Sequence, residues 1–91
     1  MKLNDFDISQ YLDSPEAIAE YLDQVLAEGD PVEIRRAIAH VAKAQGMTDI
    51  AQKSGVTRAG LYKALNENGN PSFALMGNVL KALGVRLSVT S

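Results

Sequence analysis

The chain has 91 residues, enough for one domain and too few for two, and its 46% hydrophobic and 22% charged residues exclude disorder and collagen-like repeats. The absence of cysteine excludes disulfides, zinc ribbons and thiol catalysis, and a single histidine leaves little for metal binding, so no cofactor is expected. No stretch approaches the ~20 apolar residues of a membrane span, and no signal peptide is recognisable, so we expect a single cytoplasmic domain, residues 1–91.

The N-terminal part predicts an extended arm followed by a helix. Residues 1–14 carry no helical periodicity and form the arm. A helix is predicted over residues 15–28, because Ser14 can cap it, a proline follows in its first turn and Gly29 ends it. Its apolar residues recur at helical spacing: Ile18, Leu22, Val25 and Leu26.

A second helix is predicted from Asp30, a capping residue followed by proline, to Gly46. Its apolar stripe comprises Ile34, Ala37, Ile38, Val41 and Ala42. Its polar face carries Arg36, His40 and Lys43. Because no nucleophile or acid–base motif accompanies His40, we interpret this histidine as a surface residue and expect no enzymatic activity.

Two short helices separated by a tight turn are predicted over residues 48–65. Thr48 caps the first helix, Gly55 supplies the positive φ of the turn, and Thr57 caps the second helix. Small or apolar residues occupy the positions where the two helices must touch: Ala51, Val56 and Leu61. This spacing is typical of a helix-turn-helix.

The C-terminal part predicts a fifth helix and a strand. Ser72 caps this helix and Gly84 ends it. Its apolar stripe comprises Phe73, Met76, Leu80 and Leu83. Apolar and polar residues then alternate, which predicts a strand over residues 85–90. Because a single strand is not stable, its partner is either residues 3–8 or the same strand of a second subunit.

The second helix of a helix-turn-helix lies in the DNA major groove, where its first turns face base edges. The residues expected to contact bases are Thr57, Arg58, Ala59, Tyr62 and Lys63. Residues at helix starts and on the flanking loop are expected to contact phosphates: Thr48, Gln52, Lys53, Asn70 and Ser72. An ordinary helical hairpin with a solvated basic face is the alternative. Since one such module contacts few bases, we expect a homodimer on a palindromic site.

Several segments resemble the addiction-module antidote family, HigA-like antitoxins with an Xre-type, lambda-repressor-like helix-turn-helix: Ile18-Ala19-Glu20-Tyr21-Leu22, Gly29-Asp30-Pro31, Leu61-Tyr62-Lys63-Ala64-Leu65 and Gly69-Asn70-Pro71-Ser72-Phe73. The resemblance covers nearly the whole chain. It implies an antitoxin that neutralises a RelE/ParE-type toxin, binds operator DNA and represses its own operon. The fold expected is therefore an all-α, five-helix DNA-binding domain with short terminal strands. A stand-alone or phage-type regulator without a toxin is the alternative.

The net charge of −2 hides an uneven distribution. Residues 1–34 carry nine acidic residues and one basic residue, whereas residues 35–91 carry eight basic and two acidic residues. Like charges spaced four apart destabilise a helix, so a basic partner would relieve the repulsion within the acidic part. The residues expected to face a basic toxin are Asp5, Asp7, Asp13, Glu16, Glu20 and Asp23. A merely solubilising face is the alternative.

Overall fold

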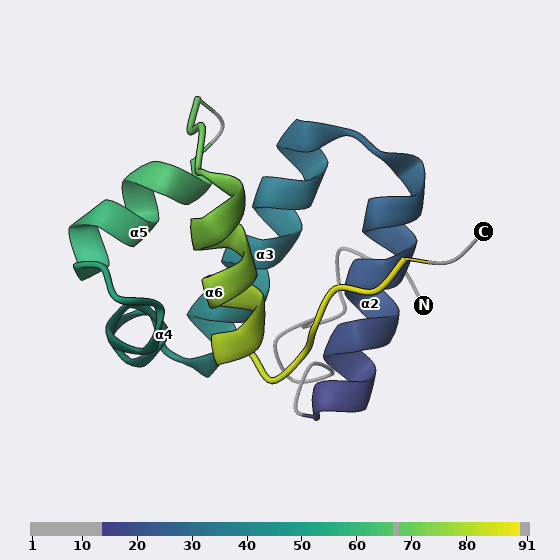
Figure 1. Ribbon diagram of the computed structural model, residues 1–91, viewed down its shortest axis with the longest axis horizontal. Coiled ribbons are helices and arrows are strands. Elements are labelled where there is room, and N and C mark those ends of the chain that lie inside the picture. Colours follow the sequence, from purple (N-terminus) through teal and green to yellow (C-terminus); the bar gives the residue numbers. More distant parts are fainter. Residues whose placement is uncertain (1–13, 67, 90–91) are drawn as a thin grey trace, which may run out of the picture.

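The computed structural model describes residues 14–66 and 68–89 (Figure 1). This part of the chain forms five α-helices: α2 (Pro15–Glu28), α3 (Pro31–Gln45), α4 (Met47–Ser54), α5 (Arg58–Leu65) and α6 (Phe73–Ala82). The predicted all-helical fold is thereby confirmed for the described residues. Of the predicted arm, all but its last residue lies outside them. None of the five helices is long and apolar enough to cross a membrane.

Four of the five helices begin where a polar side chain accepts a hydrogen bond from a backbone N–H of the first turn. These capping residues are the predicted ones: Ser14, Asp30, Thr57 and Ser72. The four capping bonds are 3.0–3.2 Å long. A cap of this kind stabilises a helix by about 1 kcal/mol, so local chemistry defines where these helices start.

Helix α4 begins differently from the prediction. Gly46, with φ +108°, is its N-cap and makes no side-chain capping bond, and Thr48 lies inside the first turn. The prediction of Thr48 as the cap was therefore wrong. Met47, the first residue of α4, is only 5% exposed, and burying an apolar side chain contributes about 1.5–3 kcal/mol, more than a typical cap.

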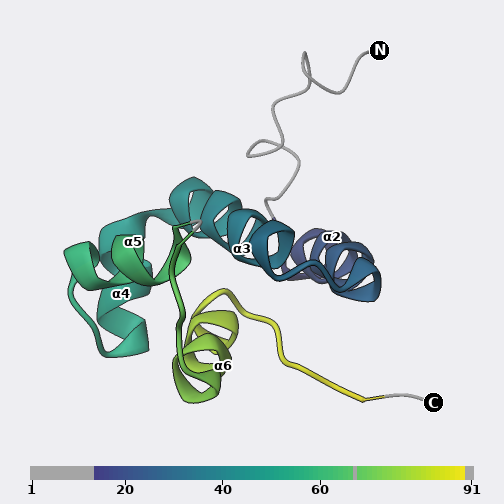
Figure 2. The same cartoon turned by 90° about the horizontal axis from the view of Figure 1, so that it is seen from above.

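All five helices contribute to one hydrophobic core. Its largest fully buried side chains are Ile18, Ile38, Ile50, Leu61, Leu83, Val41 and Val79. Helix α4 packs against α3, α5 and α6, while α2 packs against α3, as Figure 2 shows from above. Ala51, predicted to be small because α5 crosses over it, is 1% exposed. Burial of Tyr21 between α2 and α3 raises its pKa, and the nearby Glu33 carboxylate adds to the rise.

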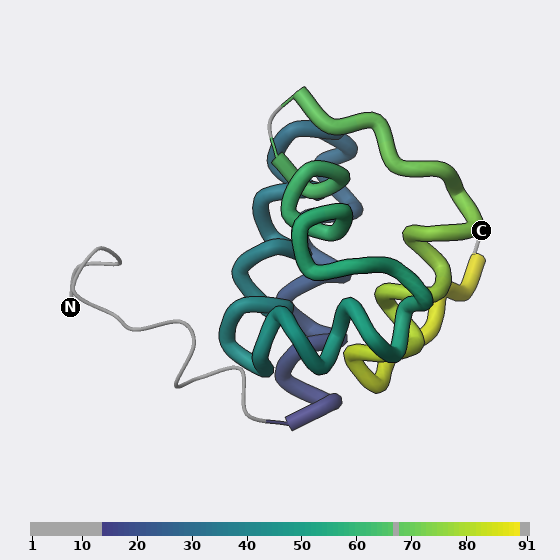
Figure 3. The backbone as a smooth tube through the Cα atoms, turned by 90° about the vertical axis from the view of Figure 1, so that its left-hand side faces the viewer, coloured from purple at the N-terminus to yellow at the C-terminus, as the bar shows by residue number. Residues whose placement is uncertain are grey.

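The helices take different positions along the long axis of the domain and around α5. Helices α4 and α5 lie at one end of the long axis and α2 lies at the other end (Figure 1). Seen from the α4–α5 end, α3 lies on one side of α5, and the loop before α6 lies on the other side (Figure 3). The outward side of α5 therefore remains uncovered by any described helix.

The turn between α4 and α5 has the predicted geometry. Gly55 adopts φ +81°, a left-handed conformation that disfavours residues with a Cβ. The N–H of Val56 donates to the carbonyl oxygen of Ala51 at 3.0 Å, which closes the end of α4. Val56 is partly buried against the core and Leu61 is fully buried.

Two predictions for the C-terminal part were wrong. Residues 85–89 do not form a strand, because no described segment pairs with them and a lone strand is not stable; residue 90 and the predicted partner, residues 3–8, lie outside the description. Phe73 is 82% exposed and does not belong to the core. Phe73 lies on the same side of α6 as Leu80, but the buried residues, Val79, Leu80 and Leu83, all lie toward the C-terminal end of the helix. The first turn therefore extends beyond the core and leaves Phe73 in solvent.

We expect Gly55→Ala to lower the free energy of unfolding by about 1–2 kcal/mol, because a Cβ is unfavourable in the left-handed conformation. Gly77 is the matched control: it lies within α6 without a positive φ, and an added Cβ would meet no atom within 4 Å. Gly77→Ala should raise the free energy of unfolding by about 0.5–1 kcal/mol. Urea unfolding followed by circular dichroism measures both changes, and equal effects of the two substitutions would contradict the assigned turn geometry.

Candidate nucleic-acid interface

Helix α5 turns its buried leucines, Leu61 and Leu65, toward the core and leaves its opposite side in solvent. The five residues predicted to contact bases are all exposed: Thr57, Arg58, Ala59, Tyr62 and Lys63. The structure therefore gathers them on and around the outward side of α5. No acidic residue interrupts this helix.

Thr57 has a structural role at the start of α5 in addition to its predicted role. Its hydroxyl oxygen accepts a hydrogen bond from the N–H of Gly60 at 3.0 Å. A Cβ at Gly60 would lie 3.0 Å from the same oxygen, so glycine at this position leaves the cap undisturbed. The hydroxyl proton of Thr57 remains available for a second hydrogen bond.

Tyr62 makes two cation–π contacts, one within α5 and one that connects α5 to α3. The guanidinium carbon of Arg58 lies 5.6 Å from the centre of the Tyr62 ring, and Nζ of Lys43 lies 5.8 Å from it. Each such contact contributes about 0.5–1 kcal/mol at an exposed site. Arg58 and Tyr62 therefore border the side of α5 that faces α3. Lys43 is absent from the predicted contacts, because its proximity to Tyr62 depends on how α3 and α5 pack.

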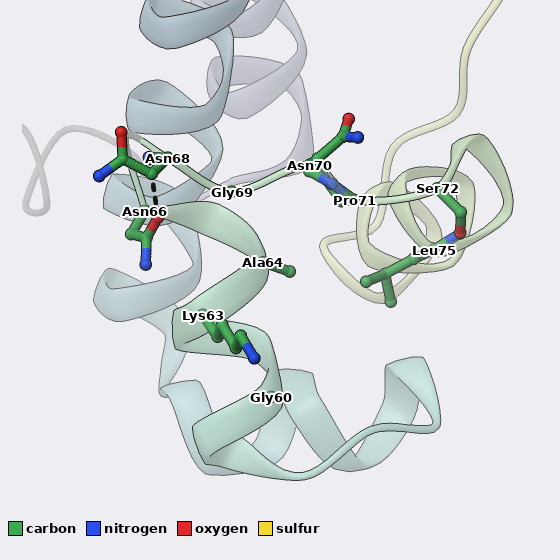
Figure 4. Close-up of a pocket in the computed structure, with 10 residues that line it drawn as sticks. All are labelled: Gly60, Lys63, Ala64, Asn66, Asn68, Gly69, Asn70, Pro71, Ser72 and Leu75. Carbon is green, nitrogen blue, oxygen red and sulfur yellow. Dashed lines mark hydrogen bonds between the residues drawn. The ribbon is translucent and has the colours of Figure 1, made fainter.

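Lys63 borders the other side of α5, where a groove of about 470 Å³ separates the helix from the following loop (Figure 4). The groove brings Lys63 together with Asn70 and Ser72, two of the predicted phosphate contacts. Its other lining residues are Gly60, Ala64, Asn66, Asn68, Gly69, Pro71 and Leu75. Because Ser72 also caps α6, this groove lies at the start of a helix, where backbone N–H groups favour anions.

Gly69 holds the loop close to the end of α5. A Cβ at Gly69 would lie 2.1 Å from the carbonyl oxygen of Ala64, a distance that real atoms do not reach. The N–H of Gly69 donates to the carbonyl oxygen of Asn66 at 2.9 Å, and the N–H of Asn68 donates to Oδ1 of Asn66, also at 2.9 Å. No local sequence signal reveals this requirement, because Gly69 does not have a positive φ and is needed only for the close approach.

The other predicted phosphate contacts lie on α4. Thr48, Gln52 and Lys53 are all exposed there, and the structure separates them from the loop residues Asn70 and Ser72. Nζ of Lys53 lies 3.1 Å from a carboxylate oxygen of Asp49, and both side chains are more than half exposed. An exposed ion pair of this kind contributes little to stability, so the lysine can exchange this partner for another anion.

The acidic residues of α2 form a separate face. Glu16, Glu20 and Asp23 are exposed on the side of α2 opposite its buried residues, whereas Asp5, Asp7 and Asp13 lie outside the described residues. Two exposed apolar side chains, Leu26 and Leu87, line a small groove beside Asp23, between α2 and the C-terminal segment. This acidic face and α5 lie at opposite ends of the molecule (Figure 1).

The described residues contain no group of three or more histidine, cysteine, aspartate or glutamate side chains that could hold a metal ion. What the structure presents is therefore two surfaces of opposite charge on one small helical domain. A polyanion fits the surface around α5, and a basic molecule fits the acidic face of α2.

Comparison with known proteins assigns the chain to a family. Residues 2–91 match the model of a family described as "Probable addiction module antidote protein". An uncharacterized protein of Haemophilus influenzae is 42% identical over 88 residues, which cover 97% of this chain and 91% of that protein. No solved structure matches the chain. The chain therefore belongs to the addiction-module antidote family, and the resemblance seen in the sequence is confirmed at that level.

The cation–π contacts of Tyr62 can be tested by two substitutions at this position. Tyr62→Phe keeps the aromatic ring and should leave the free energy of unfolding close to that of the wild type. Tyr62→Leu removes the ring and with it the attraction to Arg58 and Lys43, so the free energy of unfolding should fall by about 1–2 kcal/mol more than in Tyr62→Phe. Urea unfolding at low salt measures the difference, and identical values for the two variants would argue against these contacts.

Proposed function

We propose that the protein is an antitoxin that binds operator DNA through α4 and α5, represses its own operon and neutralises a basic toxin of the RelE/ParE type. The observation that carries the proposal is the position of two oppositely charged faces, around α5 and on α2, at opposite ends of one domain. Because the two faces do not overlap, one molecule can hold DNA and toxin at the same time. Membership of the antidote family supports the toxin-binding part.

In the proposed complex, α4 and α5 act as a helix-turn-helix and α5 enters the major groove. The Gly55 turn and the buried Ala51 support this assignment, since they let α5 cross closely over α4. Bases are read by the exposed residues of α5, with Ala59 and Lys63 farthest from the buried leucines along the helical wheel. Asn70 and Ser72 then meet one DNA strand beside Lys63.

The proposed operator complex contains two copies of the chain. A single α5 reaches the bases of one major-groove segment, which limits its specificity. Two copies related by a two-fold axis would place two such helices about one helical turn apart on a palindromic site.

The proposed toxin-binding surface is the acidic face of α2 with Asp5, Asp7 and Asp13. Helix α2 contains four acidic residues and no basic one, so a basic partner gains electrostatic attraction along its whole exposed side. Leu26 and Leu87 lie beside this face, with exposed fractions of 40% and 45%. They supply the apolar contacts that stable protein interfaces place inside a charged rim.

Base reading by Arg58 is testable with two duplexes of equal length, one carrying the region upstream of the gene and one with the same bases shuffled. Arg58→Ala should weaken binding to the upstream duplex by about 1–3 kcal/mol and binding to the shuffled duplex by less, since a bidentate base contact discriminates between sequences. Fluorescence anisotropy measures both affinities. An equal loss on both duplexes would make Arg58 a phosphate contact.

Toxin binding is testable with the toxin-like protein encoded beside the gene. The triple variant Glu16→Lys, Glu20→Lys, Asp23→Lys should lose affinity for that protein at low salt while keeping its DNA affinity. Asn78→Lys is the control, because Asn78 is exposed on a different helix, α6, and not on the acidic face of α2. Calorimetry measures the toxin affinity. Unchanged affinity of the triple variant would contradict the proposed face, and absence of any complex with the wild type would favour a stand-alone regulator.

A further inference from the structure

A second groove, of about 280 Å³, lies between α3 and the C-terminal end of α5. Its lining residues are Val32, Arg36, Ala39, His40, Lys43, Leu65 and Asn66. Every charged or titratable side chain in this lining is basic, and no carboxylate belongs to it. The groove is thus suited to an anion. It lies where α3 faces α5, whereas the groove that contains Lys63 lies between α5 and the loop before α6, and α3 and this loop lie on different sides of α5 (Figure 3).

His40 and Lys43 are two hydrogen-bond donors of this groove that a ligand can reach. Both are exposed and lie one helical turn apart on α3. Arg36 precedes His40 by four residues on the same side of the helix, but it pairs with Glu33. Both side chains of this pair are nearly half exposed, so the Glu33 carboxylate weakens the attraction of Arg36 for another anion without preventing it.

Two contacts hold this part of α3 against α5. Nζ of Lys43 lies over the Tyr62 ring, and the guanidinium group of Arg58 lies over the same ring. Farther along the two helices, Nε of Arg35 donates a hydrogen bond to the carbonyl oxygen of Asn66 at 3.2 Å. These two contacts fix the position of α3 relative to α5. A molecule bound by α5 therefore also meets His40 and Lys43 in a defined position.

We propose that His40 and Lys43 bind the phosphodiester backbone of one DNA strand, on the side of α5 opposite Lys63, Asn70 and Ser72. This inference rests on the proposed DNA-binding function. The ammonium group of Lys43, which lies over the Tyr62 ring, donates to a phosphate oxygen, and a ring N–H of His40 donates to the same backbone. The two grooves then flank α5, as two DNA strands flank the major groove.

The test compares Lys43→Gln, His40→Gln and the control Lys81→Gln, which removes the same charge from the last turn of α6. Affinity for the upstream duplex and for the shuffled duplex is measured by fluorescence anisotropy over a range of salt concentrations. Lys43→Gln should reduce the slope of log K against log salt by about 0.9, the value for one lost phosphate contact. It should weaken both duplexes by the same factor, about tenfold at low salt, because phosphate contacts carry no sequence information.

His40→Gln should weaken both duplexes equally as well, and Lys81→Gln should leave the slope unchanged. Lys43→Arg keeps the charge and should keep the wild-type slope. If Lys43→Gln binds both duplexes with the wild-type slope, or if Lys81→Gln lowers the slope equally, the α3 site is wrong while DNA binding by α5 stands. If the wild type binds neither duplex, the proposed DNA-binding function itself is wrong.

Discussion

The packing of α4 against three other helices is the constraint on which the rest of the structure depends. This helix has only eight residues and would not be stable in isolation. It is held because Met47, Ile50 and Ala51 are buried against α3, α5 and α6. The small side chain of Ala51 lets α5 approach, and the Gly55 turn directs it outward. The packing of α4 therefore determines which side of α5 is buried and which side is exposed.

The separation of charge follows from the same packing. Helix α3 lies between α2 and the α4–α5 pair (Figures 1 and 2), and the acidic residues of α2 lie opposite its buried residues, so they are kept apart from the cations of α5. If the acidic and basic side chains were adjacent, they would form ion pairs with each other. Neither set would then attract a partner of opposite charge as strongly. A domain with a net charge of only −2 thus keeps two strong local potentials.

The predictions of the fold that are confirmed depend on interactions between residues close together in the sequence. The four capping residues, such as Ser14 and Ser72, act on N–H groups two or three positions away, so their effect can be read from neighbouring residues. Where prediction failed, distant contacts decided the outcome. Met47 is buried by other helices, so α4 starts before Thr48. Residues 85–89 do not form the predicted strand, because no described segment pairs with them.

The sequence by itself determined the approximate limits of the helices within residues 14–89, the exposure of the residues of α5, the uneven charge and the family. These properties depend on residue type and on spacing within one helix. Only the tertiary structure decided that Lys43 lies over Tyr62, that Gly69 must approach Ala64, and that Lys63 shares a groove with Asn70. Such contacts join different elements, and their distances follow from how the helices pack around α4, which no local pattern encodes.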